Sequence, residues 1–375
     1  MNQLIYPRLQ PTVIAVPIHD GRIAIHQGTR QGEKSEIIED PTKWKLRALS
    51  FLNGEYELKE ILNSVNDEEY LVTESELNLF LEYLKSQNFI QDREFFDYKS
   101  LTNDQKERYS RNLNGFAALG AAQMSPEEYQ QKLFRGHVLL LGCGGLGSCT
   151  ATALAMAGCG QITLVDFDDI ELSNLNRQLY TVSDVGLQKV DGLKARLKDV
   201  NPETSVNTVV QRITGVPDIV ELIQKFKPDI VVAAIDRPVI AADRWISDAC
   251  FKTGIPGVFN SVSAGMGMFW TKYPGKSGCF RCDEKWSEKN NPDHYAMRLW
   301  REEHDLIPAT SAFSHSAMII GGMMSADIIR KLVGWPMISS GKLVSISFTT
   351  LETNVTEKPQ HPLCECCASR EVKVK

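Results

Sequence analysis

The stretch His137-Val-Leu-Leu-Leu-Gly-Cys-Gly-Gly-Leu-Gly147 decides the fold of this chain. Its apolar run leads into closely spaced glycines, and an Ala-rich segment follows. A second apolar run, Ile162 to Val165, then ends in Asp166-Phe-Asp168. This order predicts a strand, a glycine turn, a helix, a second strand and an acidic end. Such a turn lets the backbone approach a phosphate, which the N-terminus of the helix attracts.

The residues after Asp168 indicate which nucleotide chemistry the turn serves. Asp166 lies about 20 residues past the glycines, the usual distance of a carboxylate that binds a ribose hydroxyl. Arg177 and Lys189 come soon afterwards. A hydride-transfer site has no need of these cations, because the nicotinamide carries the chemistry. An attack on phosphorus does need them, since fixed cations stabilise the charge on the phosphoryl oxygens.

Length, charge and hydropathy narrow the functional classes. At 375 residues the chain is long enough for two domains, one large and one small. Its formal net charge of −6 gives no support to nucleic-acid binding, which normally needs a basic face. The N-terminus carries Pro7 and Pro11 instead of the apolar core of a signal peptide. Residues 138–165 resemble a membrane span in length, but their glycines favour a buried strand–helix–strand. We therefore expect a cytoplasmic protein without membrane contact.

Beyond Lys189, apolar runs alternate with helical patterns. Helices are expected over 190–200, 219–226, 239–252 and 314–332, and strands over 205–211, 230–235, 257–262 and 339–349. This alternation predicts an α/β domain whose Rossmann-like sheet is mostly parallel and flanked by helices.

The carboxylates at the ends of these strands suggest a cation site. Asp166, Asp168 and Asp236 each follow an expected strand, and ligands bind at the carboxyl ends of parallel strands. Three carboxylates would repel a triphosphate unless a cation intervened, so Asp236 is a candidate Mg²⁺ ligand. Asp236 is equally suited to cap the helix that starts near Pro238, and the two roles are compatible.

Residues 1–95 differ in pattern from the rest. Apolar segments flank the turn signal His19-Asp20-Gly21, a third strand is expected over 36–39, and helices over 43–52, 57–65 and 73–87. Three short strands and three helices resemble a winged-helix module. They are similar to the domains with which peptide-modifying enzymes hold a leader peptide, which would join the edge of the hairpin sheet as a further strand. A structural cap or a dimerisation arm is the alternative.

The cysteines indicate a reduced protein with a metal site. Two of the nine form Cys279-Phe-Arg-Cys282, and a second group is Cys364-Glu-Cys-Cys367. Two pairs at this spacing are a strong pattern for a tetrahedral Zn²⁺ site, and four thiolates leave no open position for catalysis. Cys364 and Cys367 have the required spacing, which favours Cys367 over Cys366 as the fourth ligand. Reduced free thiols are the alternative.

The motifs together resemble the ThiF/MoeB/MccB branch of the ubiquitin-activating superfamily, from about Arg108 to Cys367. The resemblance implies ATP and Mg²⁺ as cofactors, structural Zn²⁺, and an antiparallel extension of the sheet that begins near Gly265. It also implies a homodimer in which Arg111, from Arg108-Tyr-Ser-Arg111, reaches the partner's ATP site. The expected catalytic residues are Arg177, Lys189, Asp236 and Arg111, and the expected nucleotide-binding residues are Gly142, Gly144, Gly145, Gly147, Asp166, Asp168, Asn174 and Gln178.

Relatives that form an enzyme thioester often keep a cysteine on a loop that crosses the active site. Here that loop is expected over 286–311 and contains no cysteine, so we exclude a thioester from it. Its His294 and His304 are weak acid–base candidates, because single loop histidines are usually solvated. An amine or amide of the substrate itself is the expected acceptor of the activated carboxyl group.

The N-terminal module and the cysteine-free loop resemble the peptide-antibiotic branch of the family. This implies adenylation of a carboxylate in a ribosomally made precursor peptide. The pantocin type of maturation, in which glutamate side chains are activated and a ring closes by dehydration, is favoured over the microcin C type. The alternatives are activation of a ubiquitin-like sulfur carrier, a non-catalytic leader-docking protein and an NAD dehydrogenase.

Overall fold

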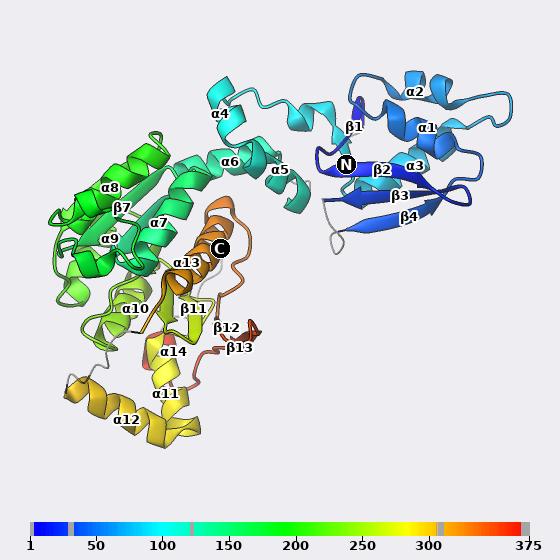
Figure 1. Ribbon diagram of the computed structural model, residues 1–375. Coiled ribbons are helices and arrows are strands. Elements are labelled where there is room, and N and C mark those ends of the chain that lie inside the picture. Colours follow the sequence, from blue (N-terminus) through cyan, green and yellow to red (C-terminus); the bar gives the residue numbers. More distant parts are fainter. Residues whose placement is uncertain (1–3, 29–33, 121–123, 305, 307–310, 369–375) are drawn as a thin grey trace. The chain divides into compact units, whose positions relative to one another are not determined.

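The computed structural model of the chain describes residues 4–28, 34–120, 124–304, 306 and 311–368 (Figure 1). The chain forms two compact units, residues 1–131 and 132–375. The domain boundary expected near residue 95 stays a prediction, because the first compact unit continues beyond it. In the described part of the chain, no helix combines the length and the apolar character that a membrane crossing requires.

The first unit contains a three-stranded antiparallel sheet and three helices that cover it. The sheet has the order β2–β3–β4, and the hairpin between β2 and β3 turns at the residues expected from the sequence. Two short strands, β1 and β5, form a separate antiparallel pair that the sequence analysis missed. The elements are β1 (Pro7–Leu9), β2 (Val13–Ile18), β3 (Arg22–Gln27), β4 (Ser35–Glu39), α1 (Trp44–Phe51), α2 (Leu58–Val65), α3 (Glu74–Ser86), β5 (Ile90–Asp92), the 3-10 helix η1 (Arg93–Phe96), α4 (Asn103–Arg108) and α5 (Ser110–Leu119).

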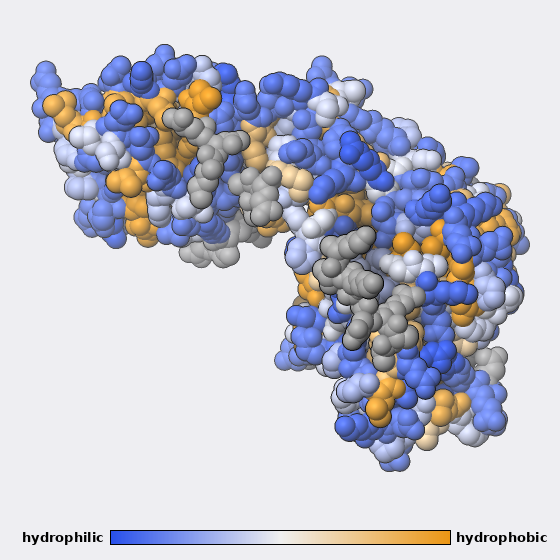
Figure 2. Space-filling view, turned by 180° about the vertical axis from the view of Figure 1, so that it is seen from behind, coloured by the Kyte–Doolittle hydropathy of each residue, from blue (hydrophilic) through white to orange (hydrophobic). Residues whose placement is uncertain are grey.

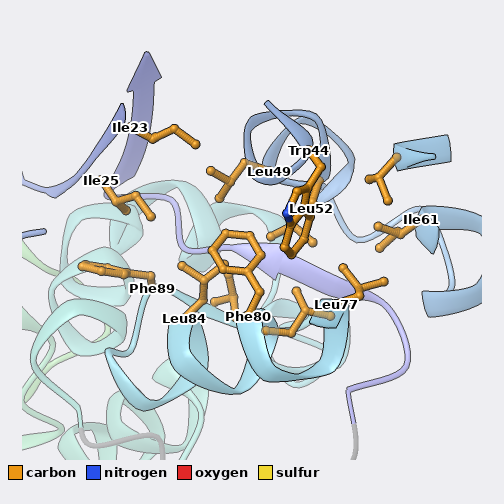
Figure 3. Close-up of a cluster of buried hydrophobic side chains, with 14 of the residues drawn as sticks. Ile23, Ile25, Trp44, Leu49, Leu52, Ile61, Leu77, Phe80, Leu84 and Phe89 are labelled. Carbon is orange, nitrogen blue, oxygen red and sulfur yellow. The ribbon is translucent and has the colours of Figure 1, made fainter. Parts of the chain in front are cut away.

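Helix α3 shows how the sequence builds this unit. Thr73 caps its N-terminus by accepting the N–H of Glu76, and the Glu76 side chain accepts the N–H of Thr73 in return. Residues at helical spacing bury one face, with Leu77, Phe80, Leu81 and Leu84 in the core. In Figure 3 this face points toward side chains of β3 and α1, so one apolar cluster joins sheet and helices.

The second unit is built around an eight-stranded sheet of order β13–β12–β11–β10–β9–β6–β7–β8. Strands β8, β7, β6, β9 and β10 are parallel to one another, and β11, β12 and β13 extend the sheet in antiparallel fashion. The expected fold class is therefore confirmed. The strands are β6 (His137–Leu141), β7 (Gln161–Asp166), β8 (Ser205–Val210), β9 (Ile230–Ala233), β10 (Gly257–Val262), β11 (Met266–Lys272), β12 (Lys342–Ser347) and β13 (Thr353–Glu357).

Helices cover both faces of the sheet, because its central strands are apolar on both sides. Alternate residues such as Leu139 and Val231 share a core with α9 and α10. Their neighbours Leu140 and Val232 are also fully buried and face the other layer, where α7 packs against α8 and α13. The helices are α6 (Pro126–Arg135), α7 (Gly145–Ala157), η2 (Leu172–Asn174), η3 (Val182–Asp184), α8 (Lys189–Val200), α9 (Val216–Phe226), α10 (Ala241–Thr253), α11 (Phe280–Asn290), α12 (Pro292–Glu303), α13 (Ser314–Val333) and α14 (Glu365–Ala368).

The segment expected to be a loop over residues 286–311 is largely helical. Asn291 caps α12 by accepting the N–H of His294, and Pro292 occupies the first turn. Arg244 of α10 pairs with Glu284 of α11 at 2.7 Å and with Glu302 of α12 at 2.6 Å. These ion pairs hold two polar helices that apolar periodicity alone did not reveal. Residues 305 and 307–310 of the segment lie outside the described part of the chain.

The outer surface is mostly polar. Figure 2 shows one face of the chain, on which blue hydrophilic residues predominate and orange residues form separate patches. Strands β6, β7 and β9 are almost entirely buried. The carboxyl ends of these three strands form the edge of the sheet on which the expected site residues lie.

Candidate functional site

The glycine turn lies between β6 and α7, as expected. Gly142 has a φ of 99°, which favours glycine, and a Cβ there would lie 2.4 Å from the Ala234 carbonyl oxygen. A Cβ on Gly147 would lie 2.0 Å from the Gly142 carbonyl oxygen. Both positions must therefore be glycine so that the turn, α7 and the end of β9 can pack together. These two glycines are therefore required for packing, and they do not themselves leave space for a ligand.

Gly144 and Gly145 have more open surroundings. A Cβ on Gly144 would have the Gln178 Nε2 atom as its nearest neighbour, at 3.9 Å. A Cβ on Gly145 would be 3.4 Å from the Ala317 Cβ and from the Arg177 carbonyl oxygen. Gly144 is the N-cap of α7, and no side chain caps this helix. The turn therefore leaves space beside uncapped N–H groups, which is the arrangement that phosphate requires.

Asp166 ties the glycine turn to the end of β7. One carboxylate oxygen accepts the N–H of Cys143 at 2.6 Å, and the other accepts the N–H of Asp168 at 2.9 Å. The residue is 8% exposed. Its carboxylate is therefore held in one orientation at the carboxyl edge of the sheet, which suits a ligand for a ribose hydroxyl. The role of the Asp166 carboxylate in the fold itself was not expected from the sequence.

Lys189 and Asp168 form an ion pair, with the ammonium 2.7 Å from the carboxylate. The Lys189 side chain is 10% exposed, whereas that of Asp168 is 46% exposed. Sequence analysis missed Tyr180, whose buried hydroxyl donates to the Cys143 carbonyl oxygen at 2.7 Å and lies 3.2 Å from that of Lys189. Burial raises the pKa of Tyr180, so the phenol remains protonated and joins the glycine turn to α8.

Arg177, Asn174 and Gln178 lie on and after the 3-10 turn η2, and each has different surroundings. The Arg177 guanidinium donates to the Ser173 carbonyl oxygen at 3.1 Å and to Asn176 Oδ1 at 3.0 Å. The Asn174 amide accepts the Glu171 N–H at 3.2 Å and so stabilises the turn. The buried Gln178 Oε1 atom has no hydrogen-bond partner among the described residues.

The unpartnered Gln178 amide oxygen fits a nucleotide at this site, because a ribose hydroxyl or an adenine amino group can donate to it. A buried polar atom without a partner costs about 1–3 kcal/mol, which a ligand hydrogen bond would offset. The same side chain borders the open space beside Gly144. The residues present therefore fit a nucleotide, with phosphate at the uncapped N–H groups of the turn and a hydroxyl or amino donor of the ligand at Gln178 Oε1.

The expected catalytic residues Asp236 and Arg111 are both exposed. Asp236 is exposed and follows β9, two residues after Ala234, which borders Gly142. It therefore lies at the same edge of the sheet as Asp166, where its free carboxylate suits a magnesium ion. Arg111 is exposed on α5, in the first compact unit. Its expected role in a partner's site stays a prediction.

The cysteines near the nucleotide turn are not suited to act as nucleophiles. Burial raises the pKa of Cys143 well above its usual value, and the nearby Asp166 carboxylate adds to this shift. Burial also raises the pKa of Cys149 to about 11 and that of Cys159 and Cys250 to about 12. These thiols are protonated at neutral pH and inert. His294 and His304, on and after α12, are exposed.

The expected zinc ligands come together in the second unit. The sulfur atoms of Cys279, Cys282, Cys364 and Cys367 all lie within 4.8 Å of one another. Three of the sulfur–sulfur distances are 3.9, 3.5 and 3.5 Å. A zinc tetrahedron with bonds of about 2.3 Å has edges of about 3.8 Å, so the donor set fits Zn²⁺. Cys367, which the spacing favoured, supplies the fourth sulfur of this group.

The fold and these residues define a nucleotide-binding protein of the Rossmann-like α/β class. The model of the ThiF family matches residues 109–366, and the chain belongs to this family.

The chain is 28% identical over 271 residues to the molybdopterin-synthase adenylyltransferase of Escherichia coli K12, a match that covers 71% of this chain and 98% of that protein. It is similar to the crystal structure of E. coli MccB with ATP, with a TM-score of 0.76, 25% identity and coverage of 96% of this chain and 99% of that one. The PaaA crystal structure, with a TM-score of 0.70 and 24% identity, shares the fold over 92% of this chain and 98% of that one.

Proposed function

We propose that the chain uses ATP to adenylate a carboxylate, specifically a glutamate side chain in a ribosomally made precursor peptide, and that a ring then closes by dehydration. The observation that carries the adenylation step is the space beside Gly144. The Gln178 side chain borders it, with an amide oxygen that has no hydrogen-bond partner among the described residues, and the Lys189–Asp168 pair lies at the same edge of the sheet. This combination of a phosphate cradle and fixed cations suits a reaction at phosphorus.

The reaction would take place in two balanced steps. A carboxylate oxygen attacks the α-phosphorus of ATP, the bond to the bridging oxygen breaks, and pyrophosphate leaves with that electron pair. A peptide amine or amide nitrogen then attacks the acyl carbon, loses its proton and expels AMP. Arg177 and Lys189 would stabilise the phosphoryl oxygens, and Asp166 would hold the ribose. Asp236 would bind Mg²⁺, which supplies charge neutralisation to the phosphates.

The first unit supports the choice of a peptide as the substrate. The match to molybdopterin-synthase adenylyltransferase covers nearly all of that protein but leaves more than a quarter of this chain unmatched. MccB matches 96% of this chain, and one of its crystal structures contains MccA-N7isoASN, with 26% identity and a TM-score of 0.75. We infer that the first unit, most of which precedes the ThiF match that begins at residue 109, holds a leader peptide, which joins the free edge of β4 as a further strand.

The same proposal includes a homodimer and a structural metal. Arg111 would reach into the ATP site of the partner subunit, where its guanidinium would add to the charge stabilisation by Arg177 and Lys189. The four cysteines would hold Zn²⁺, which would fix the segment after β11 to the segment before α14. A closed set of four thiolates would stabilise the fold and leave the chemistry to the nucleotide site.

One further candidate is supported by a specific observation. The molybdopterin-synthase adenylyltransferase and the sulfur carrier protein ThiS adenylyltransferase of E. coli K12, the latter 35% identical over 168 residues, are both relatives of the chain. Activation of a small sulfur-carrier protein is therefore the second candidate. A docking protein without catalysis is disfavoured, because the Lys189–Asp168 pair and the glycine turn are both intact.

ATP–pyrophosphate exchange separates these candidates. The full-length protein is incubated with radiolabelled pyrophosphate, ATP, Mg²⁺ and either a short peptide encoded beside its gene or a purified sulfur-carrier protein. We expect exchange with a glutamate-containing peptide, and a product lighter by one water in mass spectrometry. Exchange that occurs only with the carrier protein would support the second candidate. Leader binding without exchange on any substrate would identify a docking protein.

A further inference from the structure

The edge of β4 is open in the first unit. Among the described residues, β4 pairs with β3 and with no other strand. Its outer edge therefore presents unpaired N–H and C=O groups, with which an extended peptide can pair. The identity of a peptide that binds there depends on the side chains beside this edge.

Two residues of β4 face the inner side of the sheet. Ile38 pairs with Ile23, and Glu36 pairs with Ile25. Ile23 and Ile25 are 1% and 0% exposed and point into the helical core in Figure 3, so Ile38 and Glu36 lie on that same inner face. A strand added beside β4 would place its own inward-facing side chains next to this pair, two residues apart.

A groove of about 720 Å³ lies along this inner face, between β4, α1 and α3. Its apolar lining includes Ile38, Trp44, Leu79 and Phe80. Leu79 is 64% exposed, although it directly precedes the core residue Phe80 on α3. An exposed leucine at the wall of an apolar groove favours an apolar side chain of the incoming strand opposite Ile38.

The rim of the groove is acidic. Glu39, Asp40 and Glu76 line it, and Glu36 lies beside it, 3.5 Å from the Tyr83 hydroxyl. Within the described part of the chain, none of these four carboxylates forms an ion pair with Lys or Arg. The cation in the lining, Lys45, donates instead to the Glu39 carbonyl oxygen at 2.7 Å. Asp40 and Glu76 already accept hydrogen bonds from N–H and O–H groups, so Glu36 and Glu39 supply the negative charge that a ligand can neutralise.

The Glu76 carboxylate keeps its charge over a wide pH range. The Tyr70 hydroxyl, which donates to it at 2.6 Å, and the hydrogen bonds from Thr73 lower the pKa of Glu76 to about 2. Asp40 accepts the backbone N–H groups of Lys45 and Leu46, which fixes its orientation. Hydrogen bonds within the domain therefore hold the Asp40 and Glu76 carboxylates in fixed positions.

We propose that this groove selects a cationic leader segment, in which an apolar side chain opposite Ile38 lies two residues from a Lys or Arg opposite Glu36. This inference rests on the proposed leader binding and adds the chemistry of the leader. The apolar residue would fill the space between Ile38, Leu79 and Trp44, and the cation would neutralise the β4 carboxylate. Backbone pairing with β4 would fix the two-residue spacing.

A display library of random short peptides tests the pattern on the full-length protein. Recovered sequences are expected to be enriched in Lys or Arg two positions from a large apolar residue. A labelled recovered peptide is then titrated by fluorescence anisotropy. Glu36→Gln should weaken binding by up to about fivefold, the range of a cross-strand charge pair. Leu79→Ser should weaken it by about tenfold through lost apolar contact.

The controls are Glu107→Gln on α4 and Leu119→Ser on α5, which remove an exposed carboxylate and an exposed leucine outside the groove. Both are expected to bind like the parent protein. Recovery of acidic or uncharged peptides, or no retained peptide, would overturn the proposal. So would a response to Glu36→Gln without one to Leu79→Ser, since that is charge attraction alone. Pyrophosphate exchange reports the adenylation step separately, so either proposal can fail while the other stands.

Discussion

At the scale of single residues, the glycines of the turn have two different roles, close packing and space for a ligand. Gly147 has no room for a side chain, because a Cβ would collide with the Gly142 carbonyl oxygen. Gly144 has room, with its nearest neighbour at 3.9 Å. The first position therefore serves the packing of α7 on the sheet, and the second keeps space free for a ligand.

Alanine at each of these positions should separate the two demands. Gly147→Ala should lower the free energy of unfolding by about 3 kcal/mol, because backbone atoms must move. Gly144→Ala should leave the melting temperature nearly unchanged and weaken ATP binding at least about tenfold, since its methyl group would occupy the phosphate space. Thermal unfolding and calorimetric ATP titration measure both effects. Normal ATP affinity in Gly144→Ala would place the phosphates elsewhere.

The two cations after the turn provide a second prediction at this scale. Lys189→Ala and Arg177→Ala should each reduce pyrophosphate exchange about 10²–10³-fold, because each removes a charge that stabilises the phosphoryl oxygens. Lys194→Ala, an exposed position on the same helix as Lys189, is the matched control and should exchange normally. Arg177→Ala and Lys194→Ala should unfold near the temperature of the parent protein. Lys189→Ala should unfold at a lower temperature but remain folded at about 25 °C, because the Lys189 side chain is buried and the Asp168 carboxylate left behind is 46% exposed. Exchange at the normal rate in both variants would exclude the proposed role.

At the scale of elements, long-range contacts decide the segment between β11 and α13. Helices α11 and α12 depend on ion pairs with Arg244 of α10, and the start of α11 depends on cysteines from the end of the chain. Buried Lys272 of β11 pairs with Asp283 of α11 at 2.5 Å. Polar helices of this kind gain their stability from tertiary contacts rather than from an apolar stripe.

The cysteine cluster yields a prediction for these elements. The purified protein should contain about one zinc ion per chain, and Cys364→Ser should lose it because the tetrahedron lacks one thiolate. The melting temperature should then fall by at least about 5 °C. Cys366→Ser should keep both the metal and the stability. Metal analysis by mass spectrometry and thermal unfolding provide the readouts, and zinc retained in Cys364→Ser would reject this ligand set.

At the scale of the whole molecule, Arg111 and Lys189 lie in different compact units of one chain. If Arg111 completes the site of a partner subunit, two inactive variants should rescue each other. In a mixture of Arg111→Ala and Lys189→Ala, about half of the dimers are mixed, and one of their two sites has both residues. Exchange should therefore recover to about a quarter of the parent rate after subunits are exchanged. Activity that stays at the level of the separate variants would show that Arg111 does not act across subunits.

Sequence patterns predicted the fold well where elements are periodic and apolar. The strands and helices between His137 and Val262, and the hairpin around Asp20, appear within a few residues of their expected bounds. The strands β1, β5 and β13 were missed, because they are short and β13 is exposed on both faces. The helices α11 and α12 were expected as a loop, because their stabilising partners lie far away in the sequence.

For the candidate site, the sequence by itself determined which residue types are present: glycines at fixed spacing, two downstream cations, carboxylates after strands and two cysteine pairs. These are local signals, since each depends on the spacing within one short segment. Only the tertiary structure decided that Asp166 holds the glycine turn, that Tyr180 joins it to α8, that the two cysteine pairs meet and that the β4 groove has an acidic rim. These features arise between segments distant in the sequence, where packing and burial, rather than periodicity, determine which atoms meet.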